Sequence, residues 1–295
     1  MSKMCDVSVV LCTYNVEDYI YYSVKALLNQ TVKNFEIIIV DDSTDSTGKI
    51  IKRFNDQRIK YFKNNRHLGI SKSRNKAVKL SSGKYVFFTD ADCIVSRNWI
   101  EQGLQSFANS NCVGVEGKTY YVSKNYIPSF SDSVIQNLNG GQYMTCNIAY
   151  QRSILERIGG FDERYDYYED RDLALRIKKL GEQIIFNPNM IVYHQKNTMT
   201  PASYMKRAKR IRNRVLLFKK FHDNWSGKIS NPMWRIVNPL DMFILIYPPF
   251  VFQYLLVYKF REKADWALFP YIWIRKLYER LNLWQTCAKQ RVLLI

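Results

Sequence analysis

The chain of 295 residues lacks both glycine-rich motifs by which many proteins hold a nucleotide's phosphates. No G-x-G-x-x-G follows its first apolar run, and no G-x-x-x-x-G-K-[ST] occurs anywhere, which excludes the dinucleotide-fold and P-loop routes to phosphate. The six cysteines form no C-x-x-C pair, so we expect reduced, mostly buried thiols of a cytosolic protein. There is no low-complexity segment and no internal repeat. What remains is a globular chain, 47% hydrophobic, that can bury a substantial core.

Acidic residues are scarce in one part of the chain only. Residues 196–295 hold 19 basic and 5 acidic side chains, a net charge of +14, whereas residues 1–195 carry only +4. This asymmetry predicts an anionic partner for the last hundred residues, either a lipid surface or a nucleic acid. The amino terminus enters a strand pattern at once, so we expect no signal peptide.

The first ninety residues alternate between strand and helix patterns. Apolar runs predict strands over 7–12, 35–40, 58–62 and 85–89, and helical spacing predicts helices over 17–30 and 71–80. A further helix, capped by Ser43 or Thr44, is expected to run to about Phe54. Short connections between such elements are typical of a doubly wound α/β fold with a parallel sheet and right-handed crossovers.

Two carboxylates stand one residue apart at Asp90 and Asp92, where the most apolar run ends. They would lie at the carboxyl edge of the sheet, where open α/β folds bind ligands. Two carboxylates so close repel each other unless a cation or a proton lies between them, and Mg2+ or Mn2+ suits carboxylates together with substrate phosphates. The sequence therefore predicts a metal–diphosphate site. An acidic turn in which Asp90 bonds backbone amides is the alternative.

Other candidate residues surround this pair. Arg74 or Lys72 could help to hold phosphate, and Asp41, at the end of a strand, could accept hydrogen bonds from a base or ribose. Asp41 could equally be a carboxylate favoured by a helix dipole, so both interpretations stay open. The prediction of a diphosphate site depends on how many of these side chains lie close to the acidic pair.

The second half of the sheet region adds acidic residues at a helix start. Glu169, Asp170 and Asp172 open a helix that ends at Gly181, where carboxylates commonly complement the dipole. Asp170 could instead take a proton from an acceptor hydroxyl if it faces the sheet edge. His194 ends the second of two short strands expected over 184–186 and 190–193, and is a candidate metal ligand. A long polar and aromatic loop is expected over 125–139.

The basic tail carries helical and apolar patterns. Residues 205–221 have helical spacing with eight basic and no acidic side chains, as in a helix at a membrane surface or a positive rim beside diphosphate. Residues 242–258 carry no charge, but Pro248 and Pro249 would break a spanning helix, so two half-helices that enter one leaflet fit better. Aromatic residues interleaved with basic ones over 266–284 are typical of interfacial anchors. A soluble helical cap, or a homodimer interface, is left open.

Six blocks in order are similar to motifs of the family 2 glycosyltransferases. They are VSVVLCTYN (7–15), EIIIVDDSTD (36–45), LGISKSRN (68–75), YVFFTDAD (85–92), IGGFDE (158–163) and YEDRDLALR (168–176). The resemblance covers about two thirds of the chain, from Val7 to His194. It implies a GT-A fold, with a mostly parallel mixed sheet flanked by helices. The expected domains are a catalytic domain over 1–198, with donor half 1–92 and acceptor half 93–198, and a helical, membrane-associated extension over 199–295.

The resemblance also implies roles for individual residues. Nucleoside binding falls to Thr13, Tyr14 and Asp41, and the donor side of the pocket to Arg74. The acidic pair Asp90 and Asp92 would bind the metal, with Asp92 the closer ligand, His194 a further one, and Asp90 alternatively on the ribose. Within the Glu169-Asp170 motif, Asp170 would be the catalytic base of an inverting single displacement. The processive signature Q-x-x-R-W is replaced by the basic run 206–214, which implies one sugar per encounter.

These inferences predict a metal-dependent glycosyltransferase that uses a nucleotide-diphosphate sugar and transfers a hexosyl or N-acetylhexosaminyl group. The acceptor is expected to be a lipid-linked glycan or polyprenyl phosphate, and the location the cytoplasmic face of the cell membrane, peripheral or monotopic. A nucleotidyltransferase with a similar sheet is one alternative. A nucleic-acid-binding module is the other, and the long apolar runs between the basic residues argue against it.

Overall fold

The computed structural model describes residues 6–221 and 260–290, so the predicted apolar segment 242–258 lies outside the described residues. The chain divides into two compact units, which we describe separately. The sheet unit comprises residues 1–125 and 135–195, and the helical unit comprises residues 126–134 and 196–295.

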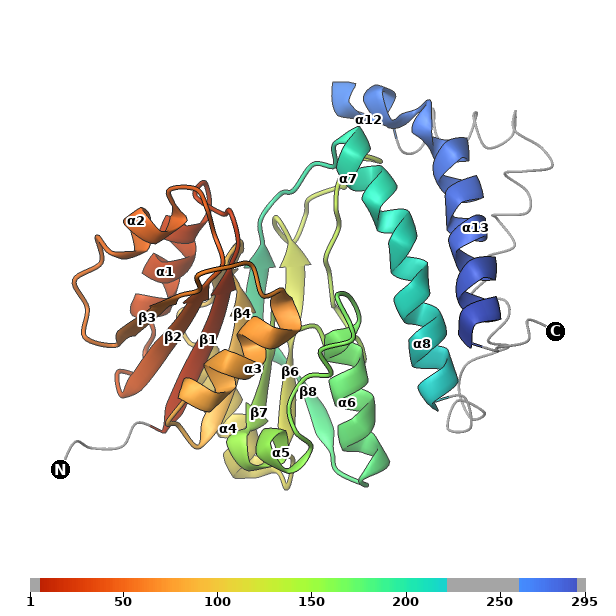
Figure 1. Cartoon of the computed structure of the whole chain (residues 1–295). Coiled ribbons are helices and arrows are strands. Elements are labelled where there is room, and N and C mark those ends of the chain that lie inside the picture. The colour runs from red at the N-terminus through yellow and green to blue at the C-terminus, as the bar shows by residue number, and fades with distance from the viewer. Residues whose placement is uncertain (1–5, 222–259, 291–295) are drawn as a thin grey trace. The chain divides into compact units, whose positions relative to one another are not determined.

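The sheet unit is built on one eight-stranded mixed sheet with the order β3-β2-β1-β4-β7-β6-β8-β5 (Figure 1). The strands are β1 (Val7–Thr13), β2 (Phe35–Asp41), β3 (Ile59–Lys63), β4 (Tyr85–Asp90), β5 (Cys93–Val95), β6 (Gly114–Tyr121), β7 (Ile148–Gln151) and β8 (Ile184–His194). Strands β3, β2, β1 and β4 run parallel to one another, and β6 runs parallel to β8. Strand β7 is antiparallel to both β4 and β6, and β5 is antiparallel to β8. The expected mixed sheet, mostly parallel, is therefore present.

Helices cover both faces of this sheet because the side chains of each strand alternate between two buried clusters. The helices are α1 (Ile20–Leu28), α2 (Thr47–Ile51), α3 (Ile70–Leu80), α4 (Trp99–Asn109), α5 (Arg152–Arg157) and α6 (Glu169–Lys179). On one face α1, α2 and α4 pack against strand residues such as Leu11, Ile39 and Phe87. On the other face α3, α5 and α6 pack against residues such as Val10 and Phe88.

Two local predictions were wrong, and one short strand was not predicted. The two short strands expected over 184–186 and 190–193 are one strand, β8, because a shift of its register between Gly117 and Lys118 of β6 absorbs the polar residues in its middle. Helix α2 begins at Thr47 with Ser46 at its cap, since Ser43 bonds the chain beside β1 instead. The short strand β5 was not anticipated, because three residues are too few to show a period.

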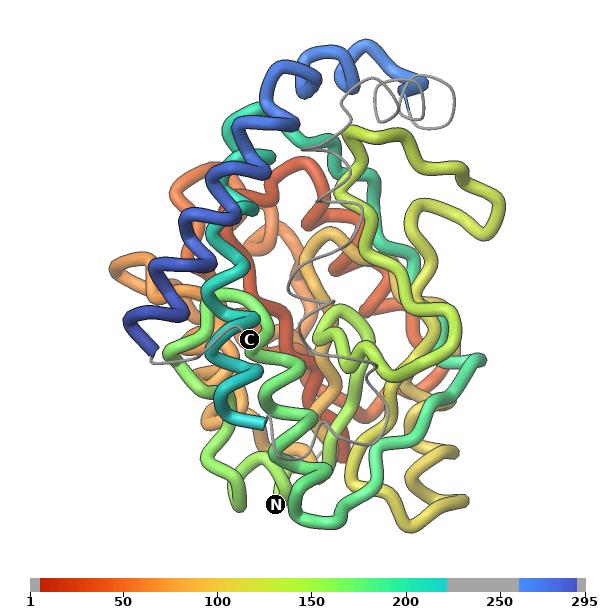
Figure 2. The backbone as a smooth tube through the Cα atoms, turned by 90° about the vertical axis from the view of Figure 1, so that its right-hand side faces the viewer, coloured from red at the N-terminus to blue at the C-terminus, as the bar shows by residue number. Residues whose placement is uncertain are grey.

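The helical unit consists of α7 (Pro201–Lys206), a 3-10 turn η1 (Arg207–Arg210), α8 (Ile211–Phe221), α12 (Lys263–Leu268) and α13 (Tyr271–Gln290). The 205–221 pattern is therefore helical, interrupted by the 3-10 turn. Helices α8 and α13 lie side by side in both views (Figures 1 and 2) and share a small cluster of Val215, Leu283 and Cys287. Asp265, fully buried, accepts backbone hydrogen bonds from Ser131, Arg261 and Glu262, which ties segment 126–134 to α12. In the described part of the chain, no helix is both long and apolar enough to cross a bilayer.

Candidate active site

The register of four parallel strands sets the candidate residues in a row at the carboxyl edge of the sheet. Thr13 at the end of β1 pairs with Asp41 at the end of β2, and Asp41 pairs in turn with Lys63 at the end of β3. On the other side of β1, Cys12 pairs with Asp90, the last residue of β4. Residues far apart in sequence therefore meet along one edge, as expected for an open α/β sheet.

Asp41 is fully buried in this row, and the chain itself occupies both of its carboxylate oxygens. Oδ1 accepts hydrogen bonds from the Thr13 hydroxyl and the Ser43 amide, both at 2.8 Å. Oδ2 accepts one from the Tyr61 hydroxyl at 2.6 Å and lies 3.1 Å from Lys63 Nζ. Burial opposes ionisation of Asp41, but these hydrogen bonds outweigh it and hold its pKa below the usual value. Asp41 is thus a charged anchor that fixes the ends of three strands.

Arg74 joins the acidic pair to the start of α6. It is almost completely buried on α3, with Nη2 3.0 Å from Asp90 Oδ1 and Nη1 2.5 Å from Glu169 Oε1. Burial works against its charge, but the two carboxylates outweigh burial and raise its pKa. A guanidinium presents two separate N–H edges, so one Arg can hold two carboxylates in a fixed geometry. Arg74 therefore joins the acidic pair to the Glu169-Asp170 motif at the start of α6.

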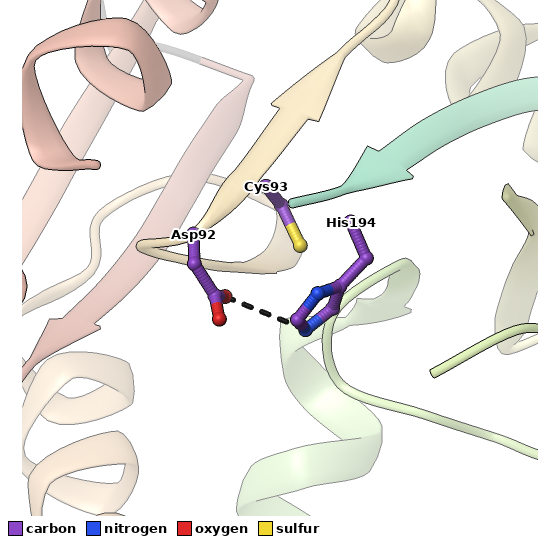
Figure 3. Close-up of side chains that lie close together, drawn as sticks. All are labelled: Asp92, Cys93 and His194. Atoms are coloured by element: carbon purple, nitrogen blue, oxygen red, sulfur yellow. Dashed lines mark ion pairs between the residues drawn. The ribbon is translucent and has the colours of Figure 1, made fainter. Parts of the chain in front are cut away.

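Asp92 and His194 meet beside Cys93 (Figure 3). Cys93 of β5 pairs with His194 of β8, and this register brings Asp92 Oδ1 to 3.5 Å from His194 Nε2. One ligand atom from each of the three residues lies within 4.8 Å of the others. Burial raises the pKa of the Cys93 thiol well above its usual value, so the thiol stays protonated and is a poor ligand for a hard cation. Asp92 and His194 remain as the two candidate metal ligands.

A hydrogen bond at Nδ1 of His194 leaves the Nε2 atom, together with Asp92, suited to bind a cation. Nδ1 lies 3.0 Å from the carbonyl oxygen of Gln195, which can only accept, so Nδ1 carries the proton. In the neutral ring Nε2 then points a lone pair toward the Asp92 carboxylate, and a proton or a metal ion must lie between them. Adjacent octahedral ligands at about 2.1 Å from a small divalent ion are about 3 Å apart, close to the observed separation. The residues present therefore fit Mn2+ or Mg2+.

Asp170 lies in the first turn of α6, next to Glu169, and is half-buried. Among the described residues, the one hydrogen bond to its carboxylate comes from the backbone amide of Arg171, at 2.7 Å. Burial and the neighbouring Glu169 charge raise its pKa to about 7, against the opposing effect of Arg74. A carboxylate with a pKa near neutrality and a free acceptor oxygen is suited to take a proton from a hydroxyl.

Tyr14, named by the resemblance, projects beyond the end of β1 and is 52% exposed. Its ring lies 4.3 Å from the ring of His67, measured between centroids. His67 belongs to a loop that Asp42 organises: Oδ2 of Asp42 accepts hydrogen bonds from the amides of Leu68 and Gly69. Sequence reasoning missed both His67 and Asp42. The signal for Asp42 was its place in the block EIIIVDDSTD, but nothing in the sequence connected it with residue 67.

Glu116 is a buried carboxylate whose structural role sequence reasoning missed. It is buried in β6 and accepts backbone hydrogen bonds from Gly141 at 2.6 Å, from Gln142 at 2.9 Å and from Tyr143, together with one from the Asn137 side chain at 2.8 Å. Gly140 and Gly141 adopt positive φ angles that glycine tolerates, which bends the loop back onto this carboxylate. The Glu116 carboxylate thus anchors the loop over 137–143.

The predicted site residues fall into several groups in the structure. Thr13, Asp41 and Asp90 lie on the strand ends, Arg74 links Asp90 to Glu169, and Asp92 faces His194. Asp170 follows Glu169 on α6, and Tyr14 lies with His67. Lys72, the alternative to Arg74 as a phosphate ligand, lies exposed on α3.

A model of the family described as "Glycosyl transferase family 2" matches residues 8–161. Among characterised relatives, a UDP-Glc:alpha-D-GlcNAc-diphosphoundecaprenol beta-1,3-glucosyltransferase of Escherichia coli, WfaP, is 35% identical over 60% of this chain and 71% of its own length. A second enzyme of that activity from Escherichia coli, WfgD, is 26% identical over 84% of this chain and 96% of its own length.

Two solved structures share the fold. Mannosyltransferase PcManGT from Pyrobaculum calidifontis, in complex with GDP-Man and Mn2+, has a TM-score of 0.60 at 18% identity and covers 97% of this chain and 85% of its own. S. aureus TarS in complex with UDP-GlcNAc has a TM-score of 0.56 at 20% identity, with 97% and 91% covered. At such identities the likeness shows the fold alone, and the mixed sheet flanked by helices is consistent with the GT-A type.

Proposed function

This chain belongs to glycosyl transferase family 2 and is a glycosyltransferase, and from that premise we propose that it moves one sugar from a nucleotide-diphosphate donor to a lipid-linked acceptor. The observation that carries this proposal is Arg74, which holds Asp90 with one N–H edge and Glu169 with the other. The buried guanidinium joins the acidic pair and the Glu169-Asp170 motif into one constellation. Metal-binding and proton-accepting carboxylates then serve one reaction centre.

The donor side comprises the strand ends and the Asp92–His194 pair. We assign the nucleoside to the edge formed by Thr13, Tyr14 and Asp41, where Asp41 fixes the strand ends and Tyr14 offers an exposed ring to stack on. Asp92 and His194, with Asp90, would hold Mn2+ or Mg2+. The bound ion would neutralise the negative charge of the diphosphate leaving group.

The acceptor side is the start of α6. Asp170 takes the proton from the acceptor hydroxyl as the oxygen attacks the anomeric carbon, and the bond to the diphosphate breaks on the opposite face, so the configuration inverts. The Glu169 carboxylate is held by Arg74, which leaves Asp170 as the proposed base. The charge of Glu169 nevertheless raises the pKa of Asp170, which keeps this base near the operating pH.

The acceptor class rests on the relatives and on the charge of the tail. Both Escherichia coli relatives are named for acceptors that carry GlcNAc on diphosphoundecaprenol. Residues 196–295 carry a net charge of +14, which favours an anionic surface where such lipids would be presented. We therefore propose a polyprenyl-diphosphate-linked sugar as acceptor and the cytoplasmic membrane face as location. The family assignment does not favour the nucleotidyltransferase or the nucleic-acid-binding alternative.

The experiment that tests this function is a thermal-shift panel of nucleotide-sugars with and without Mn2+, followed by transfer assays with each stabilising donor. A ligand at a hundred times its Kd stabilises the folded state by about 2.7 kcal/mol, so a matching donor raises the Tm by a readily measured amount. We expect stabilisation by a donor only with Mn2+, and then transfer to a GlcNAc-diphospholipid. A panel without any stabilising nucleotide-sugar would refute the donor assignment.

A further inference from the structure

An apolar stripe runs along the solvent face of α13. Its members Ile274, Leu277, Leu281 and Trp284 are each between 51% and 60% exposed. They recur at intervals of three and four residues, which places them on one line along the helix. Four large apolar side chains in one row form a contiguous surface, unlike the scattered apolar residues of an ordinary protein exterior.

The stripe is not a poorly covered part of the core, because α13 buries its opposite face. Leu283 and Cys287 pack on Val215 of α8, and Ile272 packs in a neighbouring aromatic cluster. The Asn282 side chain on the same buried face accepts a hydrogen bond from Arg212 of α8 at 3.0 Å. Helix α13 is therefore apolar on two faces, and α8 packs against one of them.

The charge around the stripe favours an anionic partner. Helix α13 carries four basic residues against one acidic residue, Glu279, which already pairs with Arg275 at 2.8 Å. Lys289 is exposed beyond the end of the stripe. Two copies of this unit, each part of a +14 segment, would repel one another, whereas anionic headgroups would attract it.

We propose that the stripe Ile274–Leu277–Leu281–Trp284 is a membrane-docking face that inserts into the headgroup region of an anionic bilayer. The helix would lie in the plane of the interface, with its apolar row toward the acyl chains and Trp284 at headgroup depth. The inference deepens the proposed function, since it names the element that would bring the enzyme to a lipid-linked acceptor. Of the aromatic anchors expected from sequence, Phe269 and Trp273 meet edge to face in a partly buried cluster, whereas Trp284 is exposed.

The test is flotation of the full-length protein with phosphatidylglycerol-containing vesicles and with pure phosphatidylcholine vesicles, without donor. Wild type should float with the anionic vesicles, more weakly as salt is raised. Leu281→Gln should partition roughly tenfold less, because a half-exposed leucine no longer inserts. Leu180→Gln is the matched control, since Leu180 is an equally exposed leucine, at 48%, in the sheet unit. Equal flotation of Leu281→Gln and wild type would overturn the proposal.

Two further measurements distinguish a bilayer from two other binding partners of the stripe, a second copy of the chain and another segment of the same chain. If wild type sediments as a dimer without vesicles and Leu281→Gln as a monomer, the stripe binds a second copy and the proposal is wrong. If Leu281→Gln lowers the Tm and leaves flotation unchanged, another segment of the chain covers the stripe, which also refutes it. Transfer to a detergent-solubilised, short-chain acceptor should be equal in wild type and Leu281→Gln. Absent transfer there would count against the proposed function, and flotation would still decide the docking face.

Discussion

The carboxylate of Asp92 faces the Nε2 atom of His194 at 3.5 Å, and the backbone of Gln195 sets which nitrogen of that ring is available. The pairing of β5 with β8 produces this contact, because Cys93 and His194 are direct partners in the ladder. A three-residue strand is thus what brings a candidate metal ligand from the end of the sheet unit to the acidic pair.

Removal of either partner should abolish metal-dependent donor binding. We expect Asp92→Ala and His194→Ala each to lower Mn2+-dependent transfer by more than about 100-fold, since even outer-shell changes at metal sites cost 10- to 100-fold. The Tm increase given by donor with Mn2+ should disappear as well. Asp18→Asn, at an exposed acidic position, serves as control. Full Mn2+-dependent activity in Asp92→Ala would remove Asp92 from the metal site.

Asp170→Asn should separate binding from chemistry. The amide keeps the size of the side chain but cannot accept the hydroxyl proton, so we expect the transfer rate to fall about 10²- to 10⁴-fold. Donor binding, read as the Tm increase with Mn2+, should stay within error of wild type. Unchanged transfer would show that Asp170 is not the base, and lost donor binding would place it on the donor side instead.

The pKa of about 7 at Asp170 predicts a pH profile for transfer. Burial and the Glu169 charge raise this pKa from its usual acidic range, so the carboxyl is protonated below pH 7 and cannot act as a base there. The rate should therefore rise with pH up to about 7 and level off above it. In Glu169→Gln the midpoint should move to lower pH, because a charge that raises the pKa is gone. A midpoint that stays in place in this variant would contradict the assignment.

Arg74→Ala should destabilise the sheet unit. The substitution leaves Glu169 buried without its cation and Asp90 half-buried without one, which costs about 3 kcal/mol when a buried pair is broken. Urea unfolding monitored by far-UV circular dichroism measures the loss. The double variant Arg74→Ala/Glu169→Gln should recover part of it, since the unpaired buried charge is removed. Additive losses in the double variant would show that the two side chains are not coupled.

Glu116→Gln should release the loop over 137–143. The glutamine keeps one acceptor oxygen and replaces the other with a donor that faces the amides of the loop, so at least one buried hydrogen bond is lost. We expect about tenfold or greater loss of hydrogen-exchange protection at Gly141 and Gln142. Protection of the amides of β1 and β2 serves as the internal control. Uniform loss across the sheet would indicate global destabilisation instead of a local anchor.

The sequence by itself determined the parts of the protein that depend on local patterns. Runs such as Phe35–Asp41 and Tyr85–Asp90 consist mostly of apolar residues, so they can be predicted as buried strands without knowledge of the fold. A carboxylate that follows such a run must lie at the sheet edge, which is why Asp41, Asp90 and Asp92 were identifiable. The ordered motif blocks then pointed to the family that the comparisons confirm.

Only the tertiary structure decided which side chains meet. The family resemblance assigned Arg74 to the donor side, yet its second N–H edge reaches Glu169, nearly a hundred positions away. Glu116 lay in an apolar strand pattern, and its role depends on a loop whose glycines bend back onto it. The exposed face of α13 could not be told from its buried face by sequence, because both are apolar and only packing on α8 distinguishes them. Register, crossovers and helix packing join distant residues, and no local pattern records those contacts.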